Sequence, residues 1–419
     1  MQGLNRLFER LRGRSEADAL PLEAPLDLLD PSFVCDPYTI YRRLRTHDPV
    51  HRSRNGGWIL TRHRDIVSAL GDPSLGNAPS RYSVVAPRNR GRYVCANVAQ
   101  NILPFLDKPE HVRPRRILSR VLSTHMKDNP LDIAQIARQL LDPQLARRQM
   151  DAIADFGTPL SAEVMCRMLG IPAPDRDRML EYSHYFFFLF APIPSDQIRQ
   201  KADEALTAFR GYFADLVQER RRKPQADLIS LLLSAEDEGE RLSDCQLVDN
   251  CMLLFSDGVE NVDAGIANIL LALGRHPAEM KRLRDAPELI ANAVAEGLRY
   301  DSPAQLIARV ARDDVEIGGQ TIKRDSTVFL ALGSANRDPA VFADPDRFNI
   351  SRNTSPLLSF GKGGHSCIGA SLVRSQSVEA VRSLLQTTTV VEVDQDGLEW
   401  LPRVGHRWLK TLPIRLFPS

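Results

Sequence analysis

Apolar residues recur at spacings of three and four positions through the middle of the chain, between about residues 130 and 280. The spacing is clearest in the stretches LDIAQIARQLLD, TPLSAEVMCRMLG and DEALTAFRGYFADLVQERRR. Residues spaced in this way share one face of an α-helix, and that face becomes the buried one. The pattern therefore predicts a body built mainly of helices.

Segments with the character of strands are few and short. They read GGWILTR near residue 60, DVEIGG and TVFLAL between residues 314 and 332, and LPIRLF near the C-terminus. We therefore expect a mainly α fold with small β-sheets at its edge. No internal repeat, low-complexity tract or linker rich in Gly and Ser divides the chain, so the sequence predicts a single domain over residues 23–419. Residues 1–22 are predicted to form an N-terminal arm, either disordered or docked on the surface.

The composition is that of an ordinary globular protein, and it limits the classes of partner. Of the 419 residues, 43% are hydrophobic and 26% are charged, with a net charge of +1. This balance gives no electrostatic reason to expect nucleic acid or an anionic membrane as the main partner. No apolar run approaches the roughly 20 residues that a membrane-spanning helix needs, and the N-terminus lacks the apolar segment of a secretory signal. Six cysteines are scattered without a CxxC pair, which favours reduced thiols in a cytoplasmic protein. We expect a monomer.

The segment Asp338–Leu358 is rich in Pro, Asp and Asn and has no period. Irregular loops of this length are uncommon inside a compact domain and usually serve a function. The segment leads directly into SFGKGGHSCIGA, residues 359–370, which a helical pattern, SLVRSQSVEAVRSLL, follows.

Cys367 in this loop is the cysteine whose surroundings predict chemistry. Gly361, Gly363 and Gly364 allow the backbone to fold tightly and to approach a flat group closely. Cys367 lies near the start of the following helix, where free N–H groups and the helix dipole favour a thiolate. A thiolate is the form that ligates iron, and on haem it favours cleavage of the O–O bond.

Two simpler interpretations of the loop compete with this one. His365 and Cys367 could form half of a zinc site, but a closed site needs four ligands and no second Cys/His pair is nearby. A glycine loop with a purely structural role is the other alternative.

The ten-residue pattern F-G-x-G-x-H-x-C-x-G, from Phe360 to Gly369, resembles the haem-binding loop of the cytochrome P450 family in its soluble bacterial form. The resemblance runs from about Asp36 to the C-terminus. It implies a cytochrome P450-like fold that binds haem b (iron-protoporphyrin IX), with Cys367 as the iron ligand. The loop residues that it places around the haem are Phe360, Gly361, His365 and Gly369.

Further basic positions fit the same resemblance. His111 and Arg115 in DKPEHVRPRR match an H-x-x-x-R motif, and a spacing of four places both on one face of a helix. The resemblance implies that these two residues, Arg309 and His365 bind the haem propionates. Arginine is well suited to carboxylate recognition.

Glu296 and Arg299 in AVAEGLRYDSP form an E-x-x-R pair. Positions i and i+3 share a helix face, so the two charges can pair. The resemblance implies a buried structural pair that Arg352, in FNISR, joins from the loop before Cys367.

The stretch CMLLFSDGVENVDAGIANILLALGRHP resembles the family's oxygen-activating helix, but departs from it at two positions. Gly258 and Glu260 are retained, whereas Asp257 replaces an alanine and Asn261 replaces a threonine. The resemblance implies that Glu260 feeds protons and that Gly258 and Asn261 accommodate oxygen. Asn261 can hold water or oxygen by hydrogen bonds, but it cannot relay a proton by rotating a hydroxyl. Asp257, with Leu253 and Asn261 on the same face, either faces the pocket or turns aside to solvent or an arginine.

The family layout also suggests which side chains contact the substrate. These are Leu253, Ser256, Asp257, Leu306, Ile307, Phe186, Phe187 and Phe190. Such a pocket suits a small, largely apolar molecule of terpenoid, fatty acyl or polyketide type. The aromatic cluster that begins at Tyr185 falls where the family has a mobile lid, although a Phe cluster is more often plain core.

The resemblance implies a monooxygenase that uses dioxygen and an external electron donor, since the chain contains no flavin or ferredoxin module. A ferredoxin could be steered to the basic positions Arg113, Arg116 and Arg120. Two alternatives remain: the same fold with atypical chemistry (peroxide-driven oxidation, desaturation, rearrangement or coupling), and a haem-binding sensor without turnover.

Overall fold

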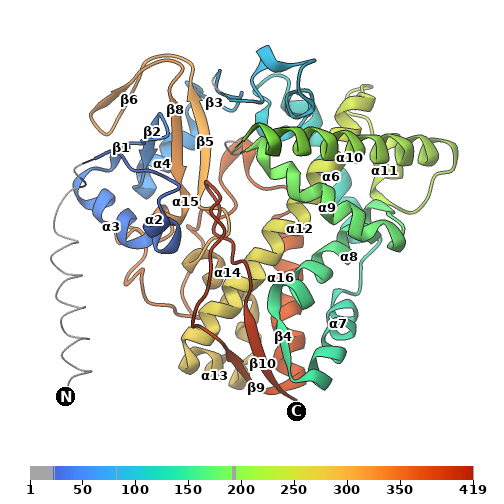
Figure 1. Ribbon diagram of the computed structural model, residues 1–419, viewed down its shortest axis with the longest axis vertical. Coiled ribbons are helices and arrows are strands. Elements are labelled where there is room, and N and C mark those ends of the chain that lie inside the picture. Colours follow the sequence, from blue (N-terminus) through green and yellow to red (C-terminus); the bar gives the residue numbers. More distant parts are fainter. Residues whose placement is uncertain (1–21, 23, 82, 191–194, 419) are drawn as a thin grey trace.

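A computed structural model of the chain describes residues 22, 24–81, 83–190 and 195–418. The arm predicted over residues 1–22 thus lies outside the described residues, apart from Leu22. Helices dominate, as the apolar spacing predicted, and α12 (Asp244–Arg275) runs through the middle of the molecule (Figure 1).

Helices before α12 form the N-terminal part and one flank of the molecule. They are α2 (Pro31–Cys35), α3 (Pro37–His47), α4 (His63–Gly71), α5 (Val94–Ala99), α6 (Val112–Asp128), α7 (Ile133–Arg147), α8 (Thr158–Leu169), α9 (Arg176–Phe186), α10 (Asp196–Arg222) and α11 (Leu228–Ser234). Those after it are α13 (Pro277–Asp285), α14 (Ile290–Tyr300), α15 (Leu332–Ala335) and α16 (Ala370–Thr387). The three stretches with helical spacing became α7, α8 and most of α10, so those predictions are confirmed.

The central helix is fixed at its start by a capping box. The Ser243 hydroxyl accepts a hydrogen bond from the Gln246 backbone N–H (3.2 Å), and the Gln246 side chain accepts one from the Ser243 N–H (3.1 Å). Most side chains of α12 are buried on every side, because the helix packs against α8, α10, α14 and α16. A helix that is apolar nearly all round belongs in the core.

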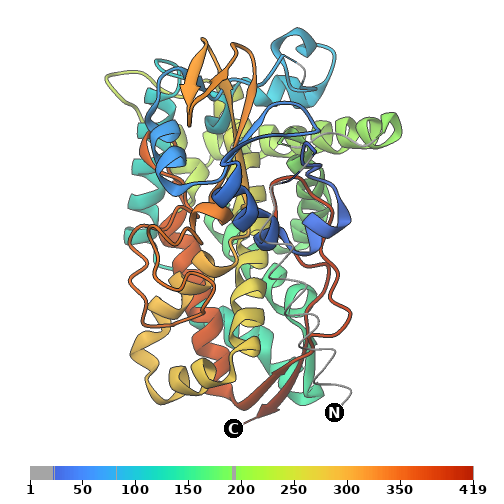
Figure 2. The same ribbon diagram turned by 90° about the vertical axis from the view of Figure 1, so that its left-hand side faces the viewer.

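Three small sheets complete the fold. The first has the order β1 (Val50–Arg52), β2 (Trp58–Leu60), β8 (Thr327–Ala331), β5 (Leu306–Ala311), β3 (Leu75–Gly76), with only β2 and β8 parallel. The second has the order β4 (Gln149–Asp151), β10 (Pro413–Pro418), β9 (Thr388–Val393), and the third is the hairpin β6 (Val315–Ile317), β7 (Gln320–Ile322). Figures 1 and 2 place the first sheet beside the upper half of α12 and the second at the lower end. Each segment predicted as strand contains one.

Residues 338–358 contain neither helix nor strand and lead into the cysteine loop, as predicted. Among the helices in the described ranges, none combines the length and the apolar character that a bilayer span requires.

Candidate active site

The cysteine loop is a tight turn that ends at the start of α16. Gly361 and Gly363 have φ angles of 64° and 76°, a left-handed region that favours glycine. The Cys367 N–H donates to the Phe360 carbonyl oxygen at 2.8 Å and closes the loop. Cys367 is thereby held three residues before the first residue of α16.

The Cys367 side chain is accessible although it lies deep in the protein, and the space that it faces is called the chamber below. Burial raises the pKa of the thiol to about 11, with a further contribution from the charge of Asp257. A hydrogen bond from the Gly369 N–H acts in the opposite direction. The helix start therefore favours a thiolate only weakly, and a bound metal cation would have to displace the proton.

One face of α12 lines the same chamber. Along this buried helix Leu254, Asp257, Gly258 and Asn261 keep partly accessible surface, and their spacing of three, one and three residues places them on one side. The charge of Asp257 raises the pKa of Cys367, so the two side chains lie near enough to interact. Within the described ranges Asp257 forms no salt bridge, and its one hydrogen bond is with Asn261.

Four basic side chains surround the cysteine loop without enough negative charge to balance them. Arg115 donates to the Ser366 hydroxyl (3.2 Å) and Arg309 to the Ala308 carbonyl (2.8 Å), and neither forms a salt bridge within the described ranges. The rings of His111 and His365 stack at 3.8 Å, and the buried Nε2 of His111 has no partner among these residues.

Burial lowers the pKa values of these four groups. Burial lowers the pKa of Arg309 to about 10. Burial, followed by the charges of His111 and Arg309, lowers the pKa of His365 to about 3. The pKa values of His111 and Arg115 are also lowered, mainly by burial. A group with two carboxylates would supply the missing charge, so the site fits the two propionates of haem.

Glu296 anchors the irregular segment to α14. Its carboxylate accepts two hydrogen bonds from Arg299 (2.6 and 2.9 Å), one from Arg352 (3.1 Å) and one from the Asn349 N–H (2.9 Å). Glu296 and Arg299 are fully buried. The structure thus brings together the three residues that the sequence grouped, and a buried charge cluster of this kind depends on every partner.

Glu260 projects from α12 toward the C-terminal segment. It accepts a hydrogen bond from Ser183 (3.3 Å) and lies 3.7 Å from Arg403, which in turn contacts the exposed His184 at 3.2 Å. Burial raises the pKa of Glu260 to about 8, and Arg403 counteracts this. Nothing in the sequence pattern had indicated Arg403.

The side chains of Asp257 and Asn261 have few hydrogen-bond partners. The Asn261 amide donates to Asp257 at 3.5 Å, while the Asn261 Oδ1 and the Ser256 hydroxyl have no partner among the described residues. Burial raises the pKa of Asp257 to about 7. Asp263 on the same helix differs, because Thr158 donates to it at 2.7 Å. Gly258 has a packing role, since a Cβ there would lie 2.5 Å from the Met165 sulfur.

The proposed substrate contacts divide into accessible and packed residues. Phe190 is partly accessible and stacks on Phe105 at 5.1 Å. Phe186 is fully buried in the main core, and Phe187 packs against Trp408 at 4.7 Å.

Three further proposed contacts lie on β5 and α12. On β5, Ile307 shares the face of Arg309, whereas Leu306 points the other way and packs beside Ile59. Leu253 is 5% exposed, and its neighbour Leu254, which the sequence analysis missed, retains more surface.

The arginines Arg113, Arg116 and Arg120 do not form a free basic surface. An acidic turn, residues 236–240, pairs with them. Arg113 lies 3.6 Å from Glu240, Arg116 lies 3.4 and 3.3 Å from Asp237 and Glu238, and Arg120 donates to the Glu236 carbonyl. The carboxylates of the turn neutralise the positive charge of these arginines, on which the predicted steering of a ferredoxin depends.

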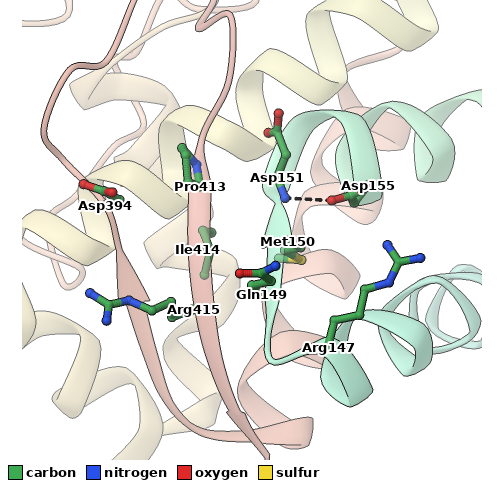
Figure 3. Close-up of a pocket in the computed structure, with 9 residues that line it drawn as sticks. All are labelled: Arg147, Gln149, Met150, Asp151, Asp155, Asp394, Pro413, Ile414 and Arg415. Atoms are coloured by element: carbon green, nitrogen blue, oxygen red, sulfur yellow. Dashed lines mark hydrogen bonds between the residues drawn. The ribbon is translucent and has the colours of Figure 1, made fainter.

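A separate hollow of about 400 Å³ lies on the sheet of β4 and β10 (Figure 3). Its acidic side chains serve the local backbone: Asp155 accepts from the Asp151 N–H (2.8 Å), and Asp151 accepts from Ile153 and Leu412 (2.9 and 3.0 Å). No cluster of His, Cys, Asp and Glu suited to a metal ion occurs in the described part of the chain, which leaves the zinc alternative without support.

Comparison with known proteins agrees with the geometry. Residues 177–400 match the family model "Cytochrome P450". The chain is 32% identical to the biotin biosynthesis cytochrome P450 of Bacillus subtilis (91% of this chain and 96% of the relative). It is 34% identical to the polyketide biosynthesis cytochrome P450 PksS of the same organism, with the same coverage.

Among solved structures, the fold is similar to P450BioI in complex with an acyl carrier protein ligated to hexadec-9Z-enoic acid. The TM-score is 0.84 at 31% identity, covering 92% of this chain and 99% of that one. The family is one of haem-thiolate monooxygenases that use dioxygen. The chain belongs to the cytochrome P450 family.

Proposed function

We propose that the protein oxidises a largely apolar acyl or polyketide chain, using haem b, dioxygen and electrons from an external ferredoxin-type donor. The observation that carries the proposal is the accessible Cys367 thiol deep in the protein, near the partly accessible face of α12. The names of the relatives support an acyl or polyketide substrate over a terpenoid, since they act in biotin and polyketide biosynthesis. A monomeric, cytoplasmic protein with one domain over residues 23–419 belongs to the same proposal.

When bound, the haem supplies a thiolate-ligated iron that activates dioxygen. Cys367 would hold the iron through its sulfur. Arg115, Arg309, His111 and His365 would bind the propionates. Phe360, Gly361 and Gly369 would shape the loop that presents Cys367.

Glu260 holds a proton for the reaction. With a pKa of about 8 it is largely protonated near neutral pH, so it can donate toward the chamber and be reprotonated from outside. Arg403 and the exposed His184 connect it to the surface. Gly258 allows α8 to pack closely enough to keep this part of α12 in place.

Asp257 and Asn261 recognise a polar group of the substrate or hold a water molecule. Their free acceptor oxygens suit a hydroxyl or amino group near the oxidised carbon. Leu254, Phe190 and Ile307 supply the apolar surface. The same two residues favour a second candidate, an atypical reaction on this fold, because Asn261 cannot relay a proton as an alcohol does.

Turnover with a surrogate ferredoxin system tests the proposal. We expect NADH consumption to rise on addition of hexadec-9Z-enoic acid, with an oxygenated product. Product formation with peroxide alone would favour the atypical reaction. Tight haem binding without any turnover would favour a sensor and overturn the proposed function.

A further inference from the structure

The segment Pro73–Leu106 carries four arginines and no acidic residue or lysine. The arginines are Arg81, Arg88, Arg90 and Arg92, and all four side chains are exposed. Arg81 lies 3.4 Å from Asp325, whereas Arg88, Arg90 and Arg92 form no salt bridge with any residue that the structure describes. A run of charge this unbalanced is unusual in a chain whose net charge is +1.

This segment, called the cover below, packs against Phe190, α12 and α10. Phe105 stacks on Phe190, and Asn101 donates to Asp249 of α12 at 2.6 Å. The Val94 N–H donates to Asp203 of α10 at 3.1 Å. The inner part of the segment is therefore fixed to the core, and its arginines lie on the outer surface of the cover.

Tyr93 stacks with the arginine at the end of this run. The guanidinium groups of Arg92 and Arg199 each lie 5.0 Å from the centre of its ring. Arg199 of α10 also pairs with Asp196 at 2.8 Å, whereas Arg92 has no carboxylate partner among the described residues. The surface hollow of about 920 Å³ between the segment and α10 is lined by both basic and acidic side chains, the acidic ones being Asp196, Asp203 and Glu204. Stacking limits the motion of Arg92 and leaves its N–H groups available to an anion.

The arginines of α6 provide a contrast within the same molecule. There the acidic turn 236–240 supplies carboxylates from the chain itself. Over Arg88, Arg90 and Arg92 no described residue does so. Exposed like charges repel one another unless a partner neutralises them, so the missing carboxylates are expected to come from another molecule.

We propose that Arg88, Arg90 and Arg92 form a docking surface for an acidic acyl carrier protein that presents the substrate chain. This docking surface depends on the acyl substrate of the proposed function, and the carrier is the protein that would deliver that substrate. A carrier offers carboxylates on its surface and a phosphate in its prosthetic arm, and arginine binds both groups in bidentate geometry. A carrier docked on this segment would bring its prosthetic arm, with the acyl chain, to the edge of the chamber. Such charges act mainly by steering association and fixing orientation.

Two ligands separate docking from chain binding: hexadec-9Z-enoic acid free in solution, and the same acid on a bacterial acyl carrier protein. Affinity of the ferric holoprotein for the free acid is measured from the low-to-high-spin shift, and affinity for the loaded carrier by calorimetry. The triple variant R88Q/R90Q/R92Q is compared with R113Q/R116Q/R120Q, which removes the same charge from α6.

We expect the first variant to bind the loaded carrier at least about tenfold more weakly, because it loses three rim contacts. Its affinity for the free acid should stay within about twofold, and the α6 variant should match wild type for both ligands. Unchanged carrier affinity in the first variant, or an equal loss in both, would overturn the docking surface. Failure of wild type to bind the free acid would count against the acyl substrate, while the calorimetry would still decide the docking.

Discussion

Two carboxylates in the interior, Glu296 of α14 and Asp257 of α12, differ in how well their oxygens are hydrogen-bonded. The Glu296 carboxylate accepts four hydrogen bonds from Arg299, Arg352 and the Asn349 backbone. Asp257 has one long hydrogen bond, and the carbonyl oxygen of its neighbour Asn261 has no partner in the described part of the protein. Glu296 is fully buried, whereas Asp257 keeps partly accessible surface. The fully bonded carboxylate holds the fold together, and the other one remains available to a ligand.

Glu296→Ala should have the largest effect. It leaves Arg299 and Arg352 without their carboxylate in the interior, which costs about 3–5 kcal/mol. The irregular segment would no longer be fixed to α14, so we expect little haem incorporation, measured as the ratio of haem to protein absorbance.

Glu379→Ala is the matched control, since Glu379 and Arg382 form another E-x-x-R pair, on the partly exposed surface of α16. It should cost less than about 1 kcal/mol. Normal holoprotein yield from Glu296→Ala would mean that the buried cluster is not needed to hold the cysteine loop.

Asp257→Asn should have the opposite effect on stability. No cationic side chain among the described residues pairs with Asp257, so its replacement is expected to leave the free energy of unfolding unchanged or raise it by about 1 kcal/mol. Binding of substrates with a hydroxyl or amino group should weaken, or electron flow should divert into peroxide. Spin-shift titration and peroxide assay measure these two outcomes.

Asp263→Asn serves as the control, because Thr158 holds that carboxyl and Asp263 lies on a different side of α12 from Asp257. If Asp257→Asn lost as much stability as Glu296→Ala, Asp257 would also hold the fold together, and the contrast between the two carboxylates would be wrong.

Asn261→Thr should have the smallest effect, confined to coupling. A threonine hydroxyl can rotate and pass a proton beside Glu260, which an amide cannot do. We expect a larger fraction of NADH to appear as product, with affinity and stability near those of wild type. An unchanged fraction would show that Asn261 does not limit proton supply.

Local patterns in the sequence predicted much of this molecule. The period of the apolar residues predicted the helices, and short motifs with fixed spacing predicted the cysteine loop and the Glu296–Arg299 pair. The family resemblance supplied one contact between distant segments, that of Arg352 with Glu296. Other such contacts had no signal in the sequence: nothing near Glu260 indicates that Arg403 approaches it from the C-terminal segment. The pairing of the acidic turn 236–240 with α6 was missed for the same reason. The face of a strand is also a tertiary property, which is why Leu306 and Ile307 were grouped although they point to opposite sides.

The Soret band of the ferrous protein with carbon monoxide tests ligation by Cys367 most directly. A thiolate ligand shifts this band strongly to the red, and we predict that shift for wild type. Cys367→Ser should lose it, because an alcohol is a far poorer anionic ligand. Absence of the shifted band in wild-type holoprotein, or its persistence in Cys367→Ser, would contradict haem ligation by this cysteine.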